Sequence, residues 1–259
     1  MKRLIAIGDI HGHLSKLDHL LSQVQPTDQD QLVFLGDYID RGPQSKQVID
    51  ALIDLQMEYP KTVFLRGNHE QLFLDALINC GAIEGERLEE MSLSWAQKMR
   101  RDTDVACFKR NGGDKTLKSY AVEVVRDNSE EHTLCPKYIM LGEIPQTHIE
   151  FLQATQYYFK TPGYIFVHAG VDFRKDKLEE QEIHTLLWDR SLDGWNHDER
   201  ALVIGHTPVA SEDNHPLVTG DLIMLDTGAA YGRALSAMDL LTGEIWQSDH
   251  KRGKGQQTL

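Results

Sequence analysis

The sequence predicts an α/β fold, in which β-sheets are flanked by helices, and two patterns carry that prediction. In the first seventy residues of the 259-residue chain, short apolar runs alternate with segments of helical periodicity. From about residue 164 onward, apolar runs of strand length follow one another closely, which indicates an antiparallel or mixed sheet. Between about residues 70 and 160 the order changes to helical stretches broken by charged loops, which we interpret as a helical insertion.

The first half of the chain contains three predicted strands: Arg3–Ile7, Gln31–Leu35 and Thr62–Leu65. A segment of helical spacing, with apolar residues at steps of three and four, follows each of the first two strands. The first set is Leu14, Leu17, Leu20, Leu21 and Val24, and the second is Val48, Ile49, Leu52 and Leu55. This βαβαβ order predicts parallel strands joined by right-handed crossovers.

The later elements follow from the same patterns. In the insertion, Leu72, Leu74, Leu77 and Ile78 predict one helix, and Ser92–Lys98 predicts another. Five strands are predicted after it: Tyr164–Val167, Ala201–Ile204, Asp221–Leu225, Leu235–Leu240 and Glu244–Gln247. Thr242-Gly243 is a typical turn between the last two strands. Because the sequence shows no internal repeat and no linker, we predict one domain over residues 1–250, followed by a flexible tail over residues 251–259.

Composition and charge narrow the classes of function. Hydrophobic residues make up 41% of the chain, enough for a sizeable core. Subtracting 40 acidic from 27 basic residues leaves a net charge of −13, which argues against nucleic acid as a partner. No apolar segment has the pattern of a signal peptide or the length of a membrane span. The chain has an odd number of cysteines, and they lack the spacing of zinc ligands: Cys80, Cys107 and Cys135. We therefore expect a reducing, cytoplasmic location.

Five short polar segments, each directly after an apolar run, contain the candidate functional residues. They are Gly8-Asp9-Ile10-His11-Gly12, Gly36-Asp37-Tyr38-Ile39-Asp40-Arg41-Gly42, Gly67-Asn68-His69-Glu70, His168-Ala169-Gly170 and Gly205-His206-Thr207-Pro208. Loops at the carboxyl ends of parallel strands form the ligand crevice of such folds, so the first three segments should meet. Glycine allows close backbone approach, and Asp, Asn and His side chains are ligands for divalent metals. Each segment alone is weak evidence for a functional site, and the prediction of metal-assisted chemistry depends on all five occurring together.

These segments resemble those of the metallophosphoesterase superfamily. The second and third are similar to the serine/threonine phosphoprotein phosphatases, in particular to short bacterial and bacteriophage members. Leu186-Leu187-Trp188-Asp189-Arg190 and Asp226-Thr227-Gly228-Ala229 extend the resemblance, which covers Arg3 to about Gln247. It implies a β-sandwich of mixed sheets flanked by helices, and the hydrolysis of phosphoric monoesters. The segment 186–190 has the short form, and the strand before Asp226 lacks the longer loop of eukaryotic members, so no regulatory partner is carried over.

The resemblance implies a dinuclear metal centre. It assigns one divalent ion to Asp9, His11 and Asp37, and the second to Asp37, Asn68, His168 and His206. Asp37 would bridge the ions, because a carboxylate has two oxygens and can span two cations. A hydroxide that bridges the two ions would attack phosphorus in line. The ligand types suit manganese, iron or zinc, and we expect manganese.

The resemblance also implies the residues that handle the substrate, a phosphorylated protein or a small phosphoester. Arg41 and Arg190 would hold the phosphoryl oxygens, since a guanidinium matches them in two-point contact. His69 would be the general acid for the leaving group. Asp40 would orient the His69 ring and raise its basicity.

Two alternatives of different classes stay open. The first is a symmetrical bis(5'-nucleosyl)-tetraphosphatase. Asp40 before Arg41 and Glu70 after His69 favour the phosphoprotein phosphatase over this alternative. The second is a non-catalytic module that binds phosphoproteins, although every catalytic position is filled. A cysteine-dependent phosphatase is disfavoured, because no cysteine is followed by Arg six residues later. Glu70 either supports the metal loop or begins the next helix, and Tyr38 is left as a packing residue.

Overall fold

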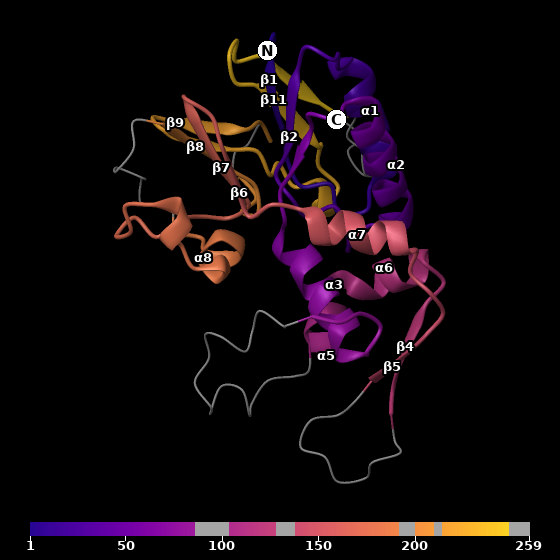
Figure 1. Ribbon diagram of the computed structural model, residues 1–259. Coiled ribbons are helices and arrows are strands. Elements are labelled where there is room, and N and C mark those ends of the chain that lie inside the picture. Colours follow the sequence, from indigo (N-terminus) through magenta and orange to yellow (C-terminus); the bar gives the residue numbers. More distant parts are fainter. Residues whose placement is uncertain (86–103, 128–137, 192–199, 210–213, 249–259) are drawn as a thin grey trace, which may run out of the picture.

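Two five-stranded sheets form the centre of the computed structural model, which describes residues 1–85, 104–127, 138–191, 200–209 and 214–248 (Figure 1). The first sheet has the strand order β12-β11-β1-β2-β3. Its parallel strands are β1 (Leu4–Ile7), β2 (Gln31–Phe34) and β3 (Val63–Phe64). β11 (Ser236–Asp239) pairs antiparallel with β1, and β12 (Ile245–Gln247) pairs antiparallel with β11. The predicted βαβαβ unit and the C-terminal hairpin are both confirmed.

The second sheet has the order β6-β7-β8-β10-β9 and is mixed, as predicted for this half of the chain. β7 (Tyr164–Val167), β8 (Ala201–Ile204) and β10 (Leu222–Met224) run parallel. The edge strands β6 (Tyr158–Lys160) and β9 (Leu217–Thr219) are antiparallel to their neighbours. The edge strands were not predicted, because each has three residues and none of them is buried, so they lack an apolar pattern.

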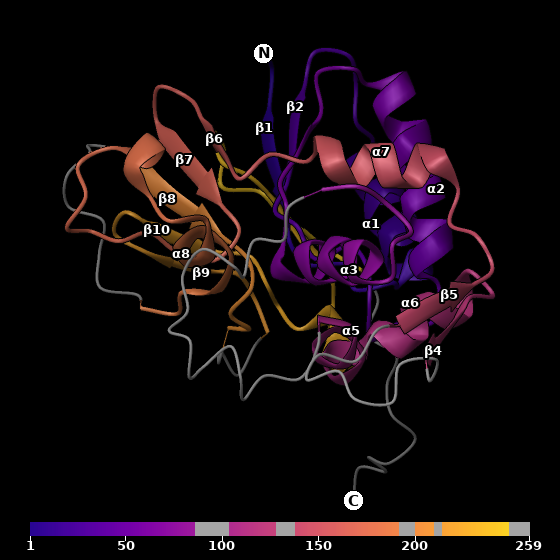
Figure 2. The ribbon, with the colours of Figure 1, turned by 60° about the horizontal axis from the view of Figure 1, so that its bottom comes forward.

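The two sheets pack face to face, and the alternation of side chains along β1 shows how. Leu4 and Ala6 belong to the apolar cluster between the sheets, together with Phe166 of β7 and Val203 of β8. Successive side chains of a strand point to opposite faces, so the intervening residues of β1 face the helices instead. Figure 2 shows the second sheet beside the first, with the helices on the far side of the first sheet.

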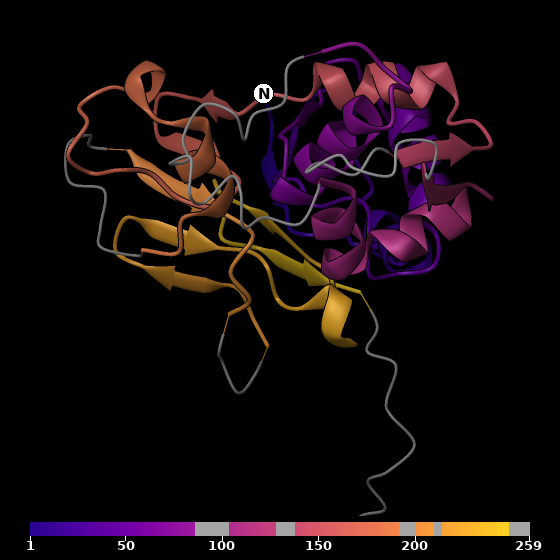
Figure 3. The same cartoon turned by 90° about the horizontal axis from the view of Figure 1, so that it is seen from below.

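Helices cover the outer face of each sheet. The first sheet is covered by α1 (Leu14–Val24) and α2 (Ser45–Glu58), with α3 (Asn68–Asn79) and α7 (Gln146–Ala154) in the same apolar cluster. The second sheet packs against α8 (Ile183–Trp188) through Leu186, and Figure 3 shows the two halves from below. The predicted β-sandwich flanked by helices is confirmed. None of the helices in the described ranges is long and apolar enough to cross a membrane.

Helices are confirmed in the predicted insertion, with α3 covering the predicted helix from Leu72 to Ile78, and the structure adds a hairpin that was not predicted. The insertion also contains α5 (Asp104–Phe108), a π-helical turn over Lys109–Gly113 and α6 (Asp114–Ser119). A hairpin of β4 (Glu123–Arg126) and β5 (Tyr138–Leu141) follows. Its strands have few buried residues, so their pattern in the sequence was weak. The predicted helix at 92–98 and the predicted tail at 251–259 lie outside the described residues.

Candidate active site

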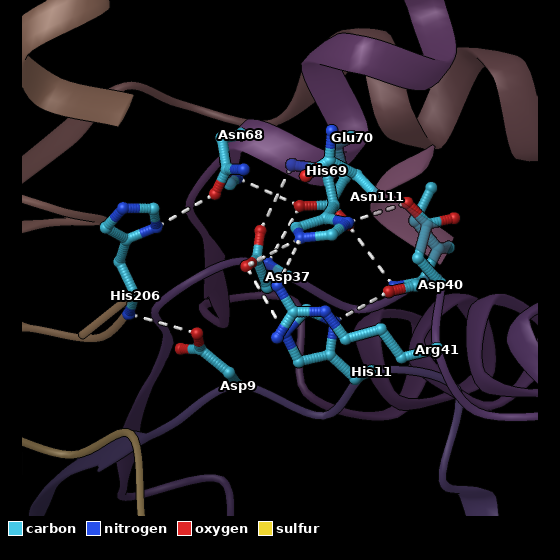
Figure 4. A network of polar contacts seen from close by, with 12 residues as sticks. Asp9, His11, Asp37, Asp40, Arg41, Asn68, His69, Glu70, Asn111 and His206 are labelled. Carbon is cyan, nitrogen blue, oxygen red and sulfur yellow. Dashed lines mark hydrogen bonds and ion pairs between the residues drawn. The ribbon is translucent and has the colours of Figure 1, made fainter. Parts of the chain in front are cut away.

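The polar segments that follow strands of both sheets converge at one edge of the sandwich (Figure 4). The loop after β1 contributes Asp9 and His11, the loop after β2 contributes Asp37, Asp40 and Arg41, α3 begins with Asn68 and His69, and His168 and His206 follow β7 and β8. Every predicted metal ligand is at least nine-tenths buried. The structure therefore brings together the residues that the five sequence segments singled out.

One group of donor atoms surrounds the Asn68 side chain. Asn68 Oδ1 lies 2.9 Å from His206 Nδ1 and 3.0 Å from His168 Nε2. His168 Nε2 is also 3.3 Å from Asp37 Oδ1. His168 Nδ1 lies 2.7 Å from the Leu35 carbonyl oxygen, to which only a protonated nitrogen can donate. This bond leaves Nε2 of the neutral ring without a proton and able to bind a cation.

A second group of donor atoms surrounds the other oxygen of Asp37. His11 Nε2 lies 3.4 Å from Asp37 Oδ2, and His69 Nε2 lies 3.8 Å from the same oxygen. His11 Nδ1 is 3.0 Å from the carbonyl oxygen of Ile39, which leaves Nε2 of the neutral ring free in the same way. Asp9 approaches from β1, where its Oδ2 accepts a hydrogen bond from the His206 backbone N–H at 3.0 Å. Asp37 thus stands between both groups of donor atoms.

Unpartnered buried atoms and perturbed pKa values show that these donors fit metal ions. Within the described ranges, Asp9 Oδ1 and His206 Nε2 are buried without a hydrogen-bond partner. Burial lowers the pKa of His206 to about 3, and burial also lowers the pKa values of His11 and His168, so all three rings are neutral. Burial, Asp226 and Asp37 raise the pKa of Asp9. Clustered carboxylates with neutral imidazoles are a donor set that cations would stabilise.

Asp37 itself is ionised. Burial alone would raise the pKa of Asp37, but the Coulombic attraction of the surrounding histidines, led by His168, His69 and His11, outweighs burial and holds the pKa well below its usual range. An ionised carboxylate with one oxygen toward each donor group has the form that a bridging ligand requires.

Glycines at the strand ends make this close approach possible. A Cβ atom on Gly67 would lie 2.1 Å from Asp37 Oδ1, and one on Gly205 would lie 2.2 Å from Asp9 Oδ1. Both distances are far below contact, so any other residue there would displace a carboxylate. Glycine directly precedes the Asp, Asn or His in four of the five segments, and at Gly67 and Gly205 this has a steric cause.

The backbone of the site is also unusual. Five non-glycine residues of the site lie in the left-handed region: His11 (φ 49°), Asp37 (φ 53°), Asp40 (φ 71°), Arg41 (φ 62°) and His206 (φ 59°). Such conformations cost free energy and persist only where the surrounding contacts impose them. Their concentration in three loops indicates that the fold holds these side chains in position at the expense of backbone strain.

His69 and Asp40 form a buried pair. His69 Nδ1 lies 2.7 Å from Asp40 Oδ2, and both side chains are almost fully buried. Burial acts to lower the pKa of His69, but Asp37 and the hydrogen bond to Asp40 outweigh it and raise the pKa. Nε2, the other ring nitrogen, faces Arg41 Nη2 at 3.1 Å. Because a guanidinium can only donate, Nε2 accepts this bond, and the ring proton lies on Nδ1 toward Asp40.

Glu70, left open between two roles in the sequence, has both. Its carboxylate accepts backbone N–H bonds from Asp37 and Tyr38 at 2.8 Å and from Gly67 at 2.9 Å. It is the third residue of α3, so the same carboxylate caps that helix and holds the loop of the shared aspartate. Tyr38 is fully buried, as predicted, and its hydroxyl donates to the Leu65 carbonyl at 2.5 Å.

The two predicted phosphate-binding arginines, Arg41 and Arg190, both act electrostatically on the histidines of the site. Arg41 Nη1 donates a hydrogen bond to the Tyr231 hydroxyl at 2.9 Å, and the guanidinium carbon lies 5.4 Å from the centre of the Tyr231 ring. Arg190, exposed just after α8, adds its positive charge to the factors that lower the pKa values of His168 and His206, behind the larger effect of burial. Tyr231 was missed, because one aromatic residue in a Gly-rich turn has no distinctive pattern.

Comparisons with known proteins agree with this geometry. The calcineurin-like phosphoesterase family matches residues 2–235. A PP2A-like serine/threonine-protein phosphatase of Candida albicans, PPG1, is 45% identical over 65 residues, which is 25% of this chain and 16% of that protein. A candidate serine/threonine-protein phosphatase of Caenorhabditis elegans is 42% identical over 65 residues, covering 25% of this chain and 18% of that one. The matches thus span less than a fifth of these relatives.

Solved structures share the fold over nearly the whole chain at low identity. A candidate diadenosine tetraphosphatase has a TM-score of 0.60 at 19% identity, with 97% of this chain and 95% of that chain covered. A cold-active protein tyrosine phosphatase has a TM-score of 0.56 at 15% identity, with 95% and 78% covered. A serine/threonine phosphatase of Saccharomyces cerevisiae has a TM-score of 0.54 at 13% identity, with 93% and 73% covered. Because the family match extends over most of the chain and the fold agrees with it, this protein belongs to the calcineurin-like phosphoesterases and is a hydrolase.

Proposed function

We propose that this protein is a dinuclear-metal phosphomonoesterase that dephosphorylates serine and threonine residues of proteins. Asp9, His11 and Asp37 would hold one divalent ion, and Asp37, Asn68, His168 and His206 the other. When bound, the two cations would supply positive charge to the phosphoryl oxygens and lower the pKa of water at the site. Manganese is the ion we propose, on ligand chemistry that iron and zinc also satisfy.

The observation that carries the proposal is the His69–Asp40 pair beside the shared aspartate. A serine or threonine alkoxide leaves poorly and needs a proton as the P–O bond breaks. His69, whose pKa is raised and whose Nδ1 is held by Asp40 at 2.7 Å, would donate that proton from Nε2 once Arg41 turns from Nε2 to the phosphoryl oxygens. Arg41 and Arg190 would bind the phosphoryl oxygens and stabilise the charge that develops on them. The sequence relatives that are named as serine/threonine phosphatases support this substrate class.

The second candidate is hydrolysis of dinucleoside tetraphosphates. It is favoured by the solved candidate diadenosine tetraphosphatase, whose fold matches 97% of this chain. A third outcome, binding of phosphoproteins without turnover, would require a defect in the site, whereas the His69–Asp40 pair and every proposed ligand residue are present in the chain.

One rate comparison separates these functions. With manganese at a fixed concentration, kcat/KM should be measured for phosphoserine, phosphothreonine, phosphotyrosine and phosphohistidine peptides and for diadenosine tetraphosphate. We expect the phosphoserine and phosphothreonine peptides to exceed the dinucleotide by roughly tenfold or more, a typical discrimination for one missing set of pocket contacts. The Asp37→Asn variant serves as the inactive control. A higher value for the dinucleotide would favour the second candidate, and no turnover of any phosphoester would favour the binding module.

A further inference from the structure

We propose that Thr116, a residue of the insertion, is a positioning residue for the acid pair His69–Asp40. The inference rests on the acid role proposed above and adds a part of the chain that none of the five sequence segments includes. Thr116 is the third residue of α6 and is fully buried, although it lies 76 residues from Asp40 in sequence.

The contacts of Asp40 show how Thr116 acts on it. The Thr116 hydroxyl lies 2.5 Å from Asp40 Oδ1, while His69 Nδ1 lies 2.7 Å from Oδ2. Each carboxylate oxygen therefore accepts one short hydrogen bond, and the plane of the carboxylate is fixed by both. A carboxylate held at one oxygen only can rotate about its Cβ–Cγ bond, and the His69 ring would rotate with it.

The same hydroxyl group also holds the backbone of Asp40. The Asp40 N–H donates to Thr116 Oγ1 at 2.9 Å and to Ser45 Oγ at 3.0 Å. The two hydroxyl oxygens are themselves 2.9 Å apart. A consistent order of protons has Ser45 donating to Thr116 and Thr116 donating to the carboxylate, because the charge-assisted bond is the shorter one. This arrangement helps to impose the left-handed φ of 71° at Asp40.

The insertion is anchored against the catalytic loop at two further points. The Gly112 carbonyl accepts the Arg41 N–H at 3.3 Å, and a Cβ on Gly112 would lie 2.9 Å from the Arg41 nitrogen. Ser119 Oγ accepts the Lys46 N–H at 3.1 Å at the start of α2. The insertion therefore contacts Asp40 and Arg41 directly, and only threonine or serine at position 116 supplies the hydroxyl group that Asp40 uses.

The test compares substrates with poor and good leaving groups. For Thr116→Val, nearly equal in shape but without the hydroxyl, we expect kcat for a phosphoserine peptide to fall by roughly 10- to 100-fold. KM and the kcat for p-nitrophenyl phosphate should stay within about twofold, because nitrophenolate leaves without a proton. Thr116→Ser should restore kcat for the phosphoserine peptide, and the metal content of each variant should equal that of the wild type. Thr62→Val is the matched control, since it makes the same change at a buried threonine outside the site whose hydroxyl has no hydrogen-bond partner within the described ranges.

Two outcomes overturn the inference: wild-type kcat for the phosphoserine peptide in Thr116→Val, or an equal loss for both substrates. If valine prevents folding, Thr116→Ala, which adds no bulk, gives the same comparison. His69→Asn in the same assay separates this failure from failure of the proposed function. A selective loss in His69→Asn with none in the Thr116 variants refutes only the positioning role. A His69→Asn variant without a selective loss refutes the acid role itself.

Discussion

At Asp37, one carboxylate serves two groups of donor atoms. Oδ1 lies 3.3 Å from His168 and Oδ2 lies 3.4 Å from His11. The residue is held by the Glu70 carboxylate on its backbone N–H and has a left-handed φ. The position of Asp37 therefore depends on Glu70, which belongs to neither group of donor atoms.

The first prediction concerns the leaving group. Replacing His69 by Asn should lower kcat for phosphoserine peptides by about 10²- to 10⁴-fold, the usual contribution of general acid catalysis. Activated aryl phosphates should lose far less. Asp40→Asn should act in the same direction but more weakly, since it leaves the proton donor in place. Steady-state kinetics on both substrates, with metal content measured on the same preparations, provide the check. Equal losses together with missing metal would show that His69 is a metal ligand instead.

The second prediction concerns a glycine. Gly67→Ala places a Cβ 2.1 Å from Asp37 Oδ1, so the shared carboxylate must move and both metal positions should lose affinity. We expect manganese binding, followed by calorimetry, to weaken by roughly 10- to 100-fold. Gly163→Ala is the control, because nothing lies within 4 Å of its Cβ. Wild-type manganese affinity in Gly67→Ala would mean that the loop can shift without cost.

At the scale of elements, the start of β1 is tied to the loop before β2. The Arg3 guanidinium donates to Asp30 Oδ1 at 3.0 Å and to Oδ2 at 2.6 Å, and Thr27 donates to Oδ2 as well. Burial alone would raise the pKa of Asp30, but the hydrogen bonds from Arg3 and Thr27 outweigh it and lower the pKa to about 2. The ionised carboxylate thus holds two elements of the first sheet together.

This pair predicts how stability depends on pH. A carboxyl group whose pKa is about 2 in the folded state and about 3.9 in the unfolded state stabilises the fold above pH 4. The contribution is lost as the pH falls from about 4 to about 2. Urea unfolding of metal-free protein should show Asp30→Asn less stable than the wild type by about 2 kcal/mol at pH 7. The gap should narrow toward pH 2, and a gap that is constant with pH would contradict the assignment.

The insertion has a part in the site that its sequence pattern did not indicate. Its helices were predicted, and the structure adds the β4–β5 hairpin to them. Its α6 contacts the N-terminal end of α2 and supplies Thr116 to the acid pair. The loop after β2 is thus held in place by a segment that is far away in the sequence.

At the scale of the whole molecule, charge and metal binding are linked. The net charge of −13 opposes the approach of a phosphate dianion, and Asp9, Asp37 and Asp226 place three carboxyl groups in the site itself. Burial, with a smaller contribution from Asp37, raises the pKa of Asp226 to about 6. Two divalent cations at the donor groups would invert the local charge and relieve the repulsion among these carboxylates.

Metal removal should therefore destabilise the folded chain. We expect two manganese ions per saturated, active chain by elemental analysis, and about one in His206→Ala. Adding manganese to chelator-treated protein should raise the free energy of unfolding by about 2.7 kcal/mol at one hundred times the Kd, for each ion that binds only the folded state. Thermal unfolding at several manganese concentrations measures this shift. One ion per active wild-type chain would rule out the dinuclear site.

Local patterns in the sequence were sufficient for the central elements and for most of the site. The strands ending before Asp9, Asp37 and Asn68 were predictable, because buried parallel strands are continuous apolar runs and the residues after them are polar and rich in glycine. The edge strands β6 and β9 and the β4–β5 hairpin were not, since exposed short strands have no such pattern. Only one role of Glu70 could be predicted from the sequence. Its position at the start of a helix is a local feature, whereas its hydrogen bonds to the loop of Asp37 depend on the tertiary structure.

The sequence by itself determined which residue types follow each strand, and these types predict metal ligands, phosphate-binding arginines and an imidazole acid. Only the tertiary structure decided which of these side chains meet. His69 pairs with an aspartate 29 residues away, and that aspartate is held by a threonine 76 residues away. The physical reason is that a hydrogen bond of 2.5 to 2.7 Å depends on how separate elements pack, which spacing along one strand or helix does not encode.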